Sequence, residues 1–464
     1  MTTASSADSD VEKQHVSLEY AEDGDITSTS DAENATTLAT PVTAPPPPPP
    51  SAQIKDGGAR AWLQVAGSFL VFGNLWGMSF AFGSFQSYYA LTYIPQESAS
   101  SIAWIGTVAV FLLILLGVLS GPLFDLGWFQ TMLIVGGLGQ TLSVFLTSIS
   151  TQYWQLMLTQ GVLQGLANGL LWLPGLALVS RSFQKRRAVA MGITTCGAPV
   201  GGIIYTLIFS QMIEKVSFGW TVRTIAFVML GTYLISFPLL LWGVSNLGDL
   251  ASGEPRKLFD RGALIDTPFW LYSFANFFIF LGYMVPFVFI PSYGQLVLKI
   301  SQRNSLYIAM IAQATSIAGR LVAGYSASHI GGMIPWTFCV ISSGVVAIAW
   351  LAAKATGAFI AVAALYGFFS GALIPLPPSI FPVVCPDAKV FGARLGMAQG
   401  FGSIASLIGP PIAAALAKAS TGSGNTNYLG LQLFAGMTML TGACVLVALW
   451  TVLIRRRNGG SKLI

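Results

Sequence analysis

The stretch that decides the fold reads SIAWIGTVAVFLLILLGVLSGP and occupies residues 101–122. It contains no charged side chain, and a helix of this length, rising about 1.5 Å per residue, reaches about 33 Å, which is enough to cross the hydrocarbon core of a bilayer. A helix on the surface of a soluble protein would carry polar side chains on its outer face. The stretch therefore predicts a membrane-spanning helix.

The rest of the chain has the same character. Of its 464 residues, 54% are hydrophobic and 9% are charged, whereas a soluble domain carries about 25% charged residues. The composition predicts an all-α integral membrane protein with twelve transmembrane helices in two six-helix halves. The twelve apolar runs are centred on residues 61–85, 101–122, 129–149, 154–179, 188–212, 223–245, 267–292, 304–326, 332–353, 357–383, 392–417 and 429–453.

Charged and proline-rich segments divide the chain into five parts. The N-terminal part is acidic and polar and ends in six consecutive prolines, which predicts a disordered tail whose proline run is a spacer or a docking segment for a partner. The predicted boundaries are 1–55 for this tail, 56–246 for the first half, 247–265 for a cytoplasmic linker, 266–454 for the second half and 455–464 for a basic cytoplasmic tail.

The distribution of basic residues sets the predicted orientation. If the N-terminal tail is cytoplasmic, fifteen Lys and Arg residues of the flanks and loops lie on the inner side and six on the outer side. Positive charge favours the cytoplasmic side, so both termini are expected there. We expect a multi-pass protein in contact with membrane lipid, in the plasma membrane or, as the alternative, in a vacuolar or other internal membrane.

The sequence gives no support for metal binding, a cofactor, a nucleic-acid partner or catalysis. An intramembrane enzyme would need paired acids, a zinc helix or a Ser-His arrangement at bilayer depth, and we find none of these patterns. The cysteines form no CxxC pair and are expected to be small packing residues. These cysteines are Cys196, Cys339, Cys385 and Cys444, and the two histidines are His15 and His329.

A weak internal repeat follows the second span of each half. Gly121-Pro-Leu-Phe-Asp125-Leu-Gly127 follows the second span, and Gly324-Tyr-Ser-Ala-Ser328-His-Ile-Gly331 follows the eighth. The first copy resembles the loop signature of the major facilitator superfamily, whose members have two six-helix halves, and the resemblance implies a gating role for Gly121 and Asp125. Ser328 replaces the acid in the second copy, which predicts a weakened charge latch.

Two segments resemble the monocarboxylate porter family, and its fungal branch in particular. They are Asp56-Gly57-Gly58-Ala59-Arg60-Ala61-Trp62 and Arg181-Ser-Phe-Gln-Lys185-Arg186-Arg187-Ala-Val-Ala-Met-Gly192. The resemblance implies a gating function for the loop Lys185, Arg186 and Arg187. The alternative is that this loop only anchors the topology on anionic lipid headgroups.

Arg320 is the most informative single residue, because it lies well inside the eighth span. A guanidinium there costs about 2.5–3.5 kcal/mol on insertion scales, so it needs a polar cavity and a partner. The family resemblance implies that it meets the substrate carboxylate, although Ser316 stands where the family has an aspartate and no first-span lysine is present. The alternative is a structural arginine that extends towards the headgroups.

The remaining polar residues of the spans are neutral. Amides and tyrosines would supply hydrogen bonds in a cavity, and aromatic side chains would stack on an apolar solute, but each of them is equally suited to joining helices. The predicted substrate-binding residues are Arg320, Ser316, Gln313, Asn74, Asn168, Trp172, Tyr205, Asn276, Tyr283 and Phe369, with Gln164 and Trp76 beside them.

Glycine and proline indicate helices that bend. The run Gly197-Ala-Pro199-Val-Gly201-Gly202 is expected to break the fifth span, and Pro375, Pro377 and Pro378 the tenth. Such breaks suit rocking between inward and outward states.

These features predict a secondary active transporter that moves a small organic solute by alternating access. The favoured substrate is a monocarboxylate-like organic anion, carried alone or with a proton. An efflux carrier for a secondary metabolite is the alternative, and a non-transporting membrane sensor on the same fold is the less favoured third reading. Nothing in the sequence names the solute.

Overall fold

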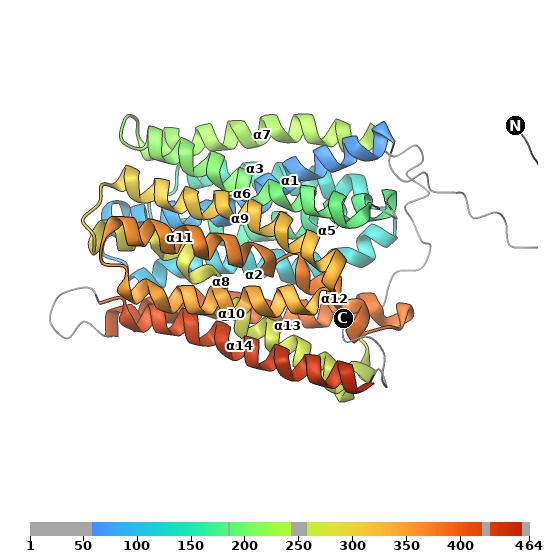
Figure 1. Cartoon of the computed structure of the whole chain (residues 1–464). Helices are drawn as coiled ribbons and strands as arrows, with labels where there is room; N and C mark the ends of the chain where they lie inside the picture. Colours follow the sequence, from blue (N-terminus) through green and yellow to red (C-terminus); the bar gives the residue numbers. More distant parts are fainter. Residues whose placement is uncertain (1–57, 184–185, 243–257, 420–426, 457–464) are drawn as a thin grey trace, which may run out of the picture. The chain divides into compact units, whose positions relative to one another are not determined.

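The computed structural model describes residues 58–183, 186–242, 258–419 and 427–456. Within these ranges the chain is helical and forms no strand, and the long helices run roughly side by side (Figure 1). The predicted tail 1–55, most of the predicted linker 247–265 and nearly all of the basic C-terminal tail 455–464 lie outside the described residues.

The helices follow one another in the predicted order. The first half contains α1 (Ala59–Tyr88), η1 (Tyr89–Tyr93), α2 (Ala99–Asp125), α3 (Phe129–Thr147), α4 (Tyr153–Leu156), η2 (Met157–Leu163), α5 (Gln164–Ser182), α6 (Arg187–Met212) and α7 (Phe218–Trp242). The second half contains η4 (Arg261–Ile265), α8 (Thr267–Leu296), α9 (Gln302–Ile330), α10 (Met333–Ala349), η5 (Trp350–Ala352), α11 (Thr356–Ser370), η6 (Gly371–Leu373), α12 (Leu376–Val384), α13 (Ala388–Ala419) and α14 (Leu429–Arg456).

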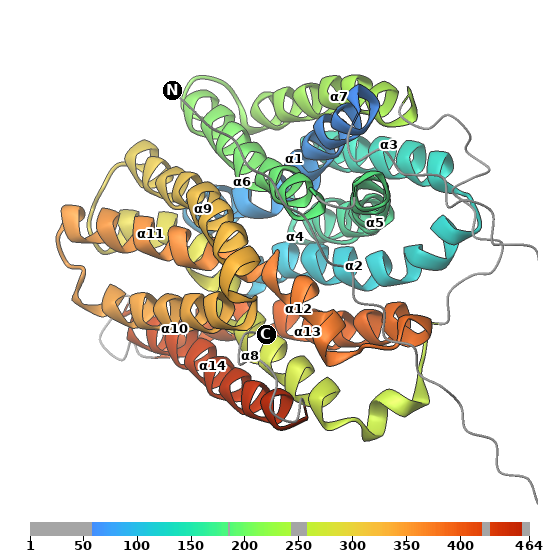
Figure 2. The same cartoon turned by 45° about the vertical axis from the view of Figure 1, so that its right-hand side comes forward.

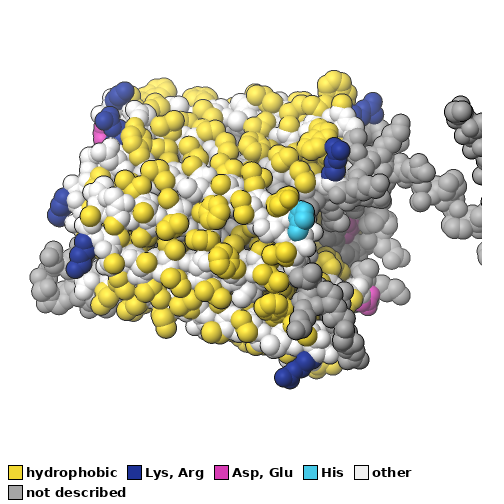
Figure 3. Space-filling view, in the orientation of Figure 1, with side chains coloured by type: hydrophobic (Ala, Val, Ile, Leu, Met, Phe, Trp, Pro, Cys, Tyr) yellow, Lys and Arg dark blue, Asp and Glu magenta, His cyan; other side chains and the backbone are white. Residues whose placement is uncertain are grey.

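The surface of the bundle is that of a membrane protein. Eleven helical segments of the described chain are long and apolar enough to span a bilayer, and the continuous run α4–η2–α5 supplies the twelfth crossing. Large side chains such as Leu234, Phe227 and Phe338 are more than half exposed, and a soluble protein would rarely leave so much apolar surface open. Figure 3 shows this apolar band with Lys and Arg side chains at its two ends. The expected fold class is confirmed.

Helices of the two halves meet along a central seam. In this seam α6 contacts α9, α2 contacts α13 and α1 contacts α8 (Figure 2). Within the first half, α1 and α6 approach so closely that a Cβ on Gly201 would lie 1.9 Å from the carbonyl oxygen of Gly73. Small residues allow such backbone contact in membranes, where packing rather than hydrophobic burial holds helices together.

The predicted breaks have different outcomes in the two halves. The fifth span is not broken, because α6 continues as one helix through Pro199, and that prediction was wrong. The tenth span is interrupted, since α11 ends at Ser370 and the short η6 precedes α12. The interruption lies at Gly371–Pro375, so that Pro377 falls in the first turn of the new helix, where a missing N–H costs no hydrogen bond.

Candidate functional site

Arg320 lies at the seam between the halves and is only 2% exposed. Its Nε donates to Ser316 Oγ, one turn earlier on α9, over 3.4 Å. Its Nη1 donates to the backbone carbonyl of Thr195 on α6 over 3.1 Å, and its Cζ lies 5.9 Å from the ring centroid of Phe80 on α1. The guanidinium therefore contacts three helices, two of which belong to the other half.

The charge of Arg320 has no counter-ion among the described residues. Its Nη2 is buried and makes no hydrogen bond, whereas Arg394 and Arg456 do form ion pairs, with Asp260 and Asp266. A buried cation without a partner is strongly unfavourable, and in membrane spans such residues commonly mark substrate or ion pathways. The site can therefore accept an anionic oxygen.

Three other predicted site residues lie close to this arginine. Ser316 accepts its Nε, and Gln313, two turns earlier on α9, donates to the carbonyl of Phe80 over 3.4 Å. The Tyr283 ring on α8 lies 5.8 Å from that of Phe287, which in turn lies 5.1 Å from the Phe80 ring that the guanidinium faces. The Gln313 Oε1 and the Tyr283 hydroxyl are buried and make no hydrogen bond. These residues provide one strong donor and two uncommitted polar groups around Phe80, and we call Arg320, Ser316, Gln313 and Tyr283 the Arg320 cluster.

Asn74 and Tyr205 belong to a different group. The Asn74 Oδ1 accepts the Tyr205 hydroxyl over 2.5 Å and the Thr232 hydroxyl over 3.0 Å. The Asn74 carbonyl accepts Gln140 Nε2 over 3.1 Å, and Gln140 in turn accepts the hydroxyl of Tyr233. This Asn74 network joins α1, α3, α6 and α7 inside the first half, as expected of polar residues that hold helices together.

The α5 helix carries a second set of predicted residues. Asn168 is completely buried, and both of its amide atoms lack a hydrogen-bond partner in the described structure. Gln164, one turn earlier, leaves its Oε1 unpaired, and Trp76 on α1 leaves its Nε1 unpaired. The Trp172 ring packs on Gly117 of α2, where an added Cβ would lie 2.1 Å from it.

Two other predicted residues, Asn276 and Phe369, have contacts of their own. Asn276 donates its Nδ2 to the carbonyl of Tyr272 on its own helix over 2.9 Å, and its Oδ1 stays unpaired. The Phe369 ring lies 5.9 Å from that of Phe338, which is 60% exposed. The structure thus places Phe369 towards the outer surface of the second half.

The predicted gating residues lie where α2 ends and around the start of α6. Gly121 and Asp125 are buried in the last turns of α2, and the chain then turns at Gly127, whose φ is 86°. The Arg186 side chain is exposed. Lys185 and the side chain of Arg187 lie outside the described part of the structure.

Several groups at the seam were not predicted. The Thr195 carbonyl is one, although Pro199, four residues later, was a signal for it. The others are three polar contacts between the halves at the predicted outer end, with no signal in the sequence. They are Gln295 Nε2 to Ser87 Oγ at 2.8 Å, Gln211 Nε2 to the Tyr307 hydroxyl at 2.6 Å and Ser100 Oγ to the Pro411 carbonyl at 2.9 Å.

A second charged cluster lies near the predicted cytoplasmic end of the second half. Arg394 donates to Asp260 over 2.7 Å and to Asp266 over 2.9 Å, and Arg456 donates to Asp266 over 3.0 Å. The hydrogen bond from Arg394 lowers the pKa of Asp260 below its ordinary value. These pairs attach η4 to α13 and α14.

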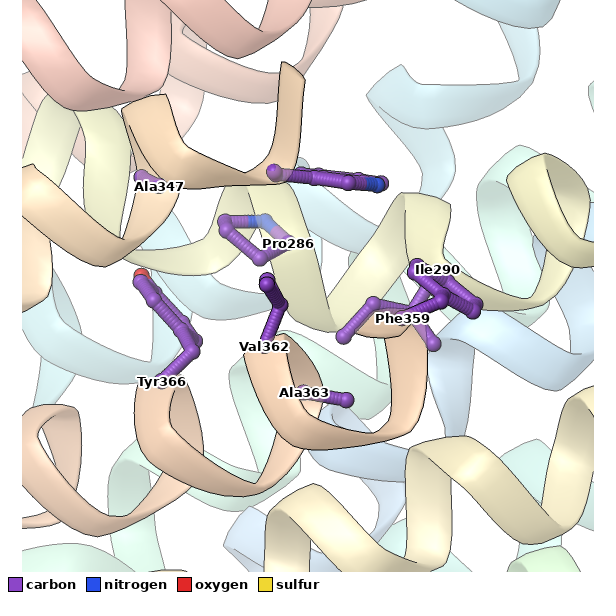
Figure 4. Close-up of a pocket in the computed structure, with 8 residues that line it drawn as sticks. Pro286, Ile290, Ala347, Phe359, Val362, Ala363 and Tyr366 are labelled. Atoms are coloured by element: carbon purple, nitrogen blue, oxygen red, sulfur yellow. The ribbon is translucent and has the colours of Figure 1, made fainter. Parts of the chain in front are cut away.

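A small apolar pocket lies within the second half (Figure 4), and the hydroxyl of its lining residue Tyr366 donates to the backbone carbonyl of Tyr283 over 2.7 Å. It contains none of the predicted site residues. Its lining residues are Pro286, Ile290, Ala347, Trp350, Phe359, Val362, Ala363 and Tyr366. Among the residues that the structure describes, no group of His, Cys, Asp and Glu side chains could hold a metal ion.

Comparison with known proteins places the chain in a family. Residues 61–357 match the model of the Major Facilitator Superfamily. The MFS-type transporter pynF of Aspergillus niger is 33% identical over 394 residues, which cover 85% of this chain and 89% of that protein. The aspyridones efflux protein apdF of Emericella nidulans is 34% identical over 86% of this chain and 79% of its own length. The agnestins efflux protein AgnL12 of Paecilomyces divaricatus is 34% identical over 83% of this chain and 86% of its own length.

A solved structure agrees on the fold. A mutant of the nucleoside transporter NupG superposes with a TM-score of 0.62 at 15% sequence identity, covering 83% of this chain and 99% of that one. These relatives are transporters, and those with efflux in their names are fungal. The chain is a multi-pass integral membrane protein that belongs to the major facilitator superfamily of transporters rather than to a family of enzymes.

Proposed function

We propose that this protein exports a small secondary metabolite that carries an acidic oxygen. Two relatives at about one third identity are named as efflux proteins for aspyridones and agnestins, which favours export over the uptake of a simple monocarboxylate. The proposal includes both termini in the cytoplasm and a location in the plasma membrane, as the basic residues predict.

The observation that carries the proposal is the buried guanidinium of Arg320. It lies between the halves, where a carrier of this fold binds its solute, and its Nη2 lacks a protein partner. The planar fork of arginine matches an acidic group with two oxygens, because two parallel N–H···O bonds fix both position and orientation. The unpaired Gln313 Oε1 would accept a hydrogen bond from a hydroxyl or N–H of the same solute, and the Tyr283 hydroxyl would donate to one of its neutral oxygens.

Alternating access is supported by where the halves hold each other. The contacts Ser87–Gln295, Gln211–Tyr307 and Ser100–Pro411 all lie at the predicted outer end. An exporter must break these bonds to release its solute outward and remake them afterwards. Each neutral hydrogen bond contributes about 1 kcal/mol, so a few of them close this end without locking it.

The experiment that tests the function compares metabolites in the medium and in cell extracts, with and without this protein, by untargeted mass spectrometry. We expect at least one acidic secondary metabolite to shift from the cells to the medium when the protein is present. Vesicles that contain Arg320→Ala should not transport this metabolite. Vesicles that contain Arg456→Ala should transport it, because Arg456 is exposed and lies outside the seam. Unchanged flux in Arg320→Ala would contradict the proposal.

Uptake of a monocarboxylate-like anion is the second candidate, and the position of Arg320 in the eighth span favours it. Proton coupling through a buried carboxylate has little support, since Ser316 occupies the position one turn before Arg320. Direction separates the two functions, because an uptake system accumulates solute inside cells. A sensor on the same fold would bind a solute without moving it.

A further inference from the structure

The α6 helix contains a carbonyl that cannot be satisfied in the usual way. In an α-helix each carbonyl accepts the N–H of the residue four positions later, and for Thr195 that residue is Pro199, which has no N–H. Pro199 lies well inside α6, and Thr195 is 6% exposed. A buried backbone carbonyl without a donor is costly and rarely left unpaired.

Arg320 of the other half supplies the missing donor. Its Nη1 lies 3.1 Å from the Thr195 oxygen. The bond is charge-assisted, which makes it stronger than a bond between neutral groups. The bond satisfies both groups, because the Thr195 carbonyl lacks its helical donor and the buried guanidinium lacks a carboxylate.

The two bonds of Arg320 also fix the plane of its guanidinium. Nε is held by Ser316 on the same helix, and Nη1 is held by Thr195 across the seam. Because a guanidinium is rigid and planar, these two points determine where Nη2 is directed. Nη2 is the nitrogen that remains unpaired.

We propose that Pro199 is a positioning residue for Arg320. It frees the Thr195 carbonyl, this carbonyl holds Nη1, and Nη2 is presented to the acidic group of the solute. The last step rests on the proposed function, whereas the contact between Pro199, Thr195 and Arg320 does not. The fifth span therefore acts on the solute through the backbone, without a side chain of its own.

A matched control exists in the same half. Pro238 lies inside α7 and frees the carbonyl of Leu234 by the same geometry. Leu234 is 68% exposed on the apolar surface, whereas Arg320 is 2% exposed. Replacing Pro238 restores a helical N–H but should leave Arg320 unaffected.

The experiment is a double-mutant cycle on the purified full-length protein, read as melting temperature without any solute. Arg320→Gln shortens the side chain, so the Thr195 carbonyl loses its donor, and we expect this loss to lower the melting temperature in the native background by more than removal of the buried charge raises it. In the Pro199→Ala background the new N–H takes that carbonyl, so the same change should lower it by about half as much or less. In the Pro238→Ala background, Arg320→Gln should lower the melting temperature by as much as it does in the native background.

The proposal would be overturned if Arg320→Gln lowered the melting temperature equally in all three backgrounds. It would also be overturned if Pro238→Ala reduced the effect of Arg320→Gln as much as Pro199→Ala does. If Ala at position 199 prevents folding, Pro199→Gly, which also restores the N–H and has no side chain to place, is used instead. With the solute identified by the metabolite comparison, Pro199→Ala should raise KM about tenfold with kcat little changed. An unchanged KM would also overturn the positioning role.

The cycle separates this proposal from the proposed function. If the effects of Pro199→Ala and Arg320→Gln on the melting temperature are coupled but Arg320→Gln transports normally, the contact is supported and the proposed acidic solute is contradicted. If the effects are additive but Arg320→Gln loses transport, the acidic solute is supported and the contact is contradicted.

Discussion

Arg320 and Arg394 belong to the same half of the chain, but their charges are compensated in different ways. Arg394 lies near the predicted cytoplasmic end and donates to Asp260 and Asp266 over 2.7 and 2.9 Å. Arg320 lies deep in the bundle and has only a hydroxyl and a carbonyl as partners. The protein supplies the acids for Arg394, whereas Arg320 would receive its acid from the solute under the proposed function.

The polar residues of the two halves repeat this contrast. The Asn74 network in the first half uses the Oδ1 of Asn74 twice and connects four helices. The Arg320 cluster leaves the Arg320 Nη2, the Gln313 Oε1 and the Tyr283 hydroxyl unpaired. The Asn74 Nδ2 is buried and unpaired as well, so the contrast lies in the hydrogen bonds that are made. Those of the first group connect four helices, which makes the structure rigid. Under the proposed function, the unpaired groups of the second, which are costly to bury, bind the solute.

The largest effect is expected for Arg320→Lys. Lysine keeps the charge but cannot reach Ser316, Thr195 and a solute at once, because its ammonium is a point donor. Transport of the acidic solute should fall about 10- to 100-fold, the cost of losing a charge-assisted bond. Initial rates in vesicles measure this, with Arg456→Lys as the control. Flux at the native rate would show that Arg320 is as structural as Arg394.

The next effect is expected for Asn74→Ala, in stability rather than in affinity. The Tyr205 and Thr232 hydroxyls would lose their acceptor inside the bundle, which costs about 3 kcal/mol in total. Thermal unfolding should therefore occur at a lower temperature, while KM of the folded fraction stays the same. If Asn74→Ala raised KM and left stability unchanged, Asn74 would be a solute-binding residue rather than one that holds helices together.

Gly319→Ala should reduce stability moderately, because it disturbs the packing of α9 against α11 next to Arg320. A Cβ at Gly319 would lie 1.8 Å from the carbonyl oxygen of Phe368 on α11, so the two helices would have to separate at a cost of about 2 kcal/mol. Gly324 on the same helix has no atom near its Cβ position, and Gly324→Ala should be neutral or stabilise the helix by up to about 1 kcal/mol. Equal stability of the two variants would contradict the close contact.

Hydropathy was sufficient to predict the spans, because a bilayer requires long apolar helices wherever the chain crosses it. The stretch 101–122 lies within α2, and 429–453 lies within α14. Helix rotation was harder to predict, because a span that is apolar on all sides gives no periodic signal. For this reason Phe369 was grouped with Arg320 although it lies beside the exposed Phe338.

The expected break at Pro199 shows a second limit of sequence reasoning. A proline removes one helical hydrogen bond, but the helix continues when another part of the protein supplies a donor. Here the donor is Arg320, which lies in another span of the other half. No local pattern around Pro199 could predict this contact, since it depends on how α6 and α9 pack.

The smallest effect is expected for Asp260→Asn, and it is the one that depends on pH. Since Arg394 lowers the folded-state pKa of Asp260, the ionised carboxylate stabilises the fold above the unfolded pKa of about 3.9, and this contribution is lost as pH falls through the lowered folded value. The melting temperatures of the native protein and Asp260→Asn should therefore differ by a constant amount from pH 5 to 8 and converge only in stronger acid. Glu214→Gln, an exposed acid, is the control. If the difference in melting temperature disappeared near neutral pH, the ion pair between Arg394 and Asp260 would not stabilise the fold, and Arg394 would resemble Arg320 in lacking a stabilising carboxylate.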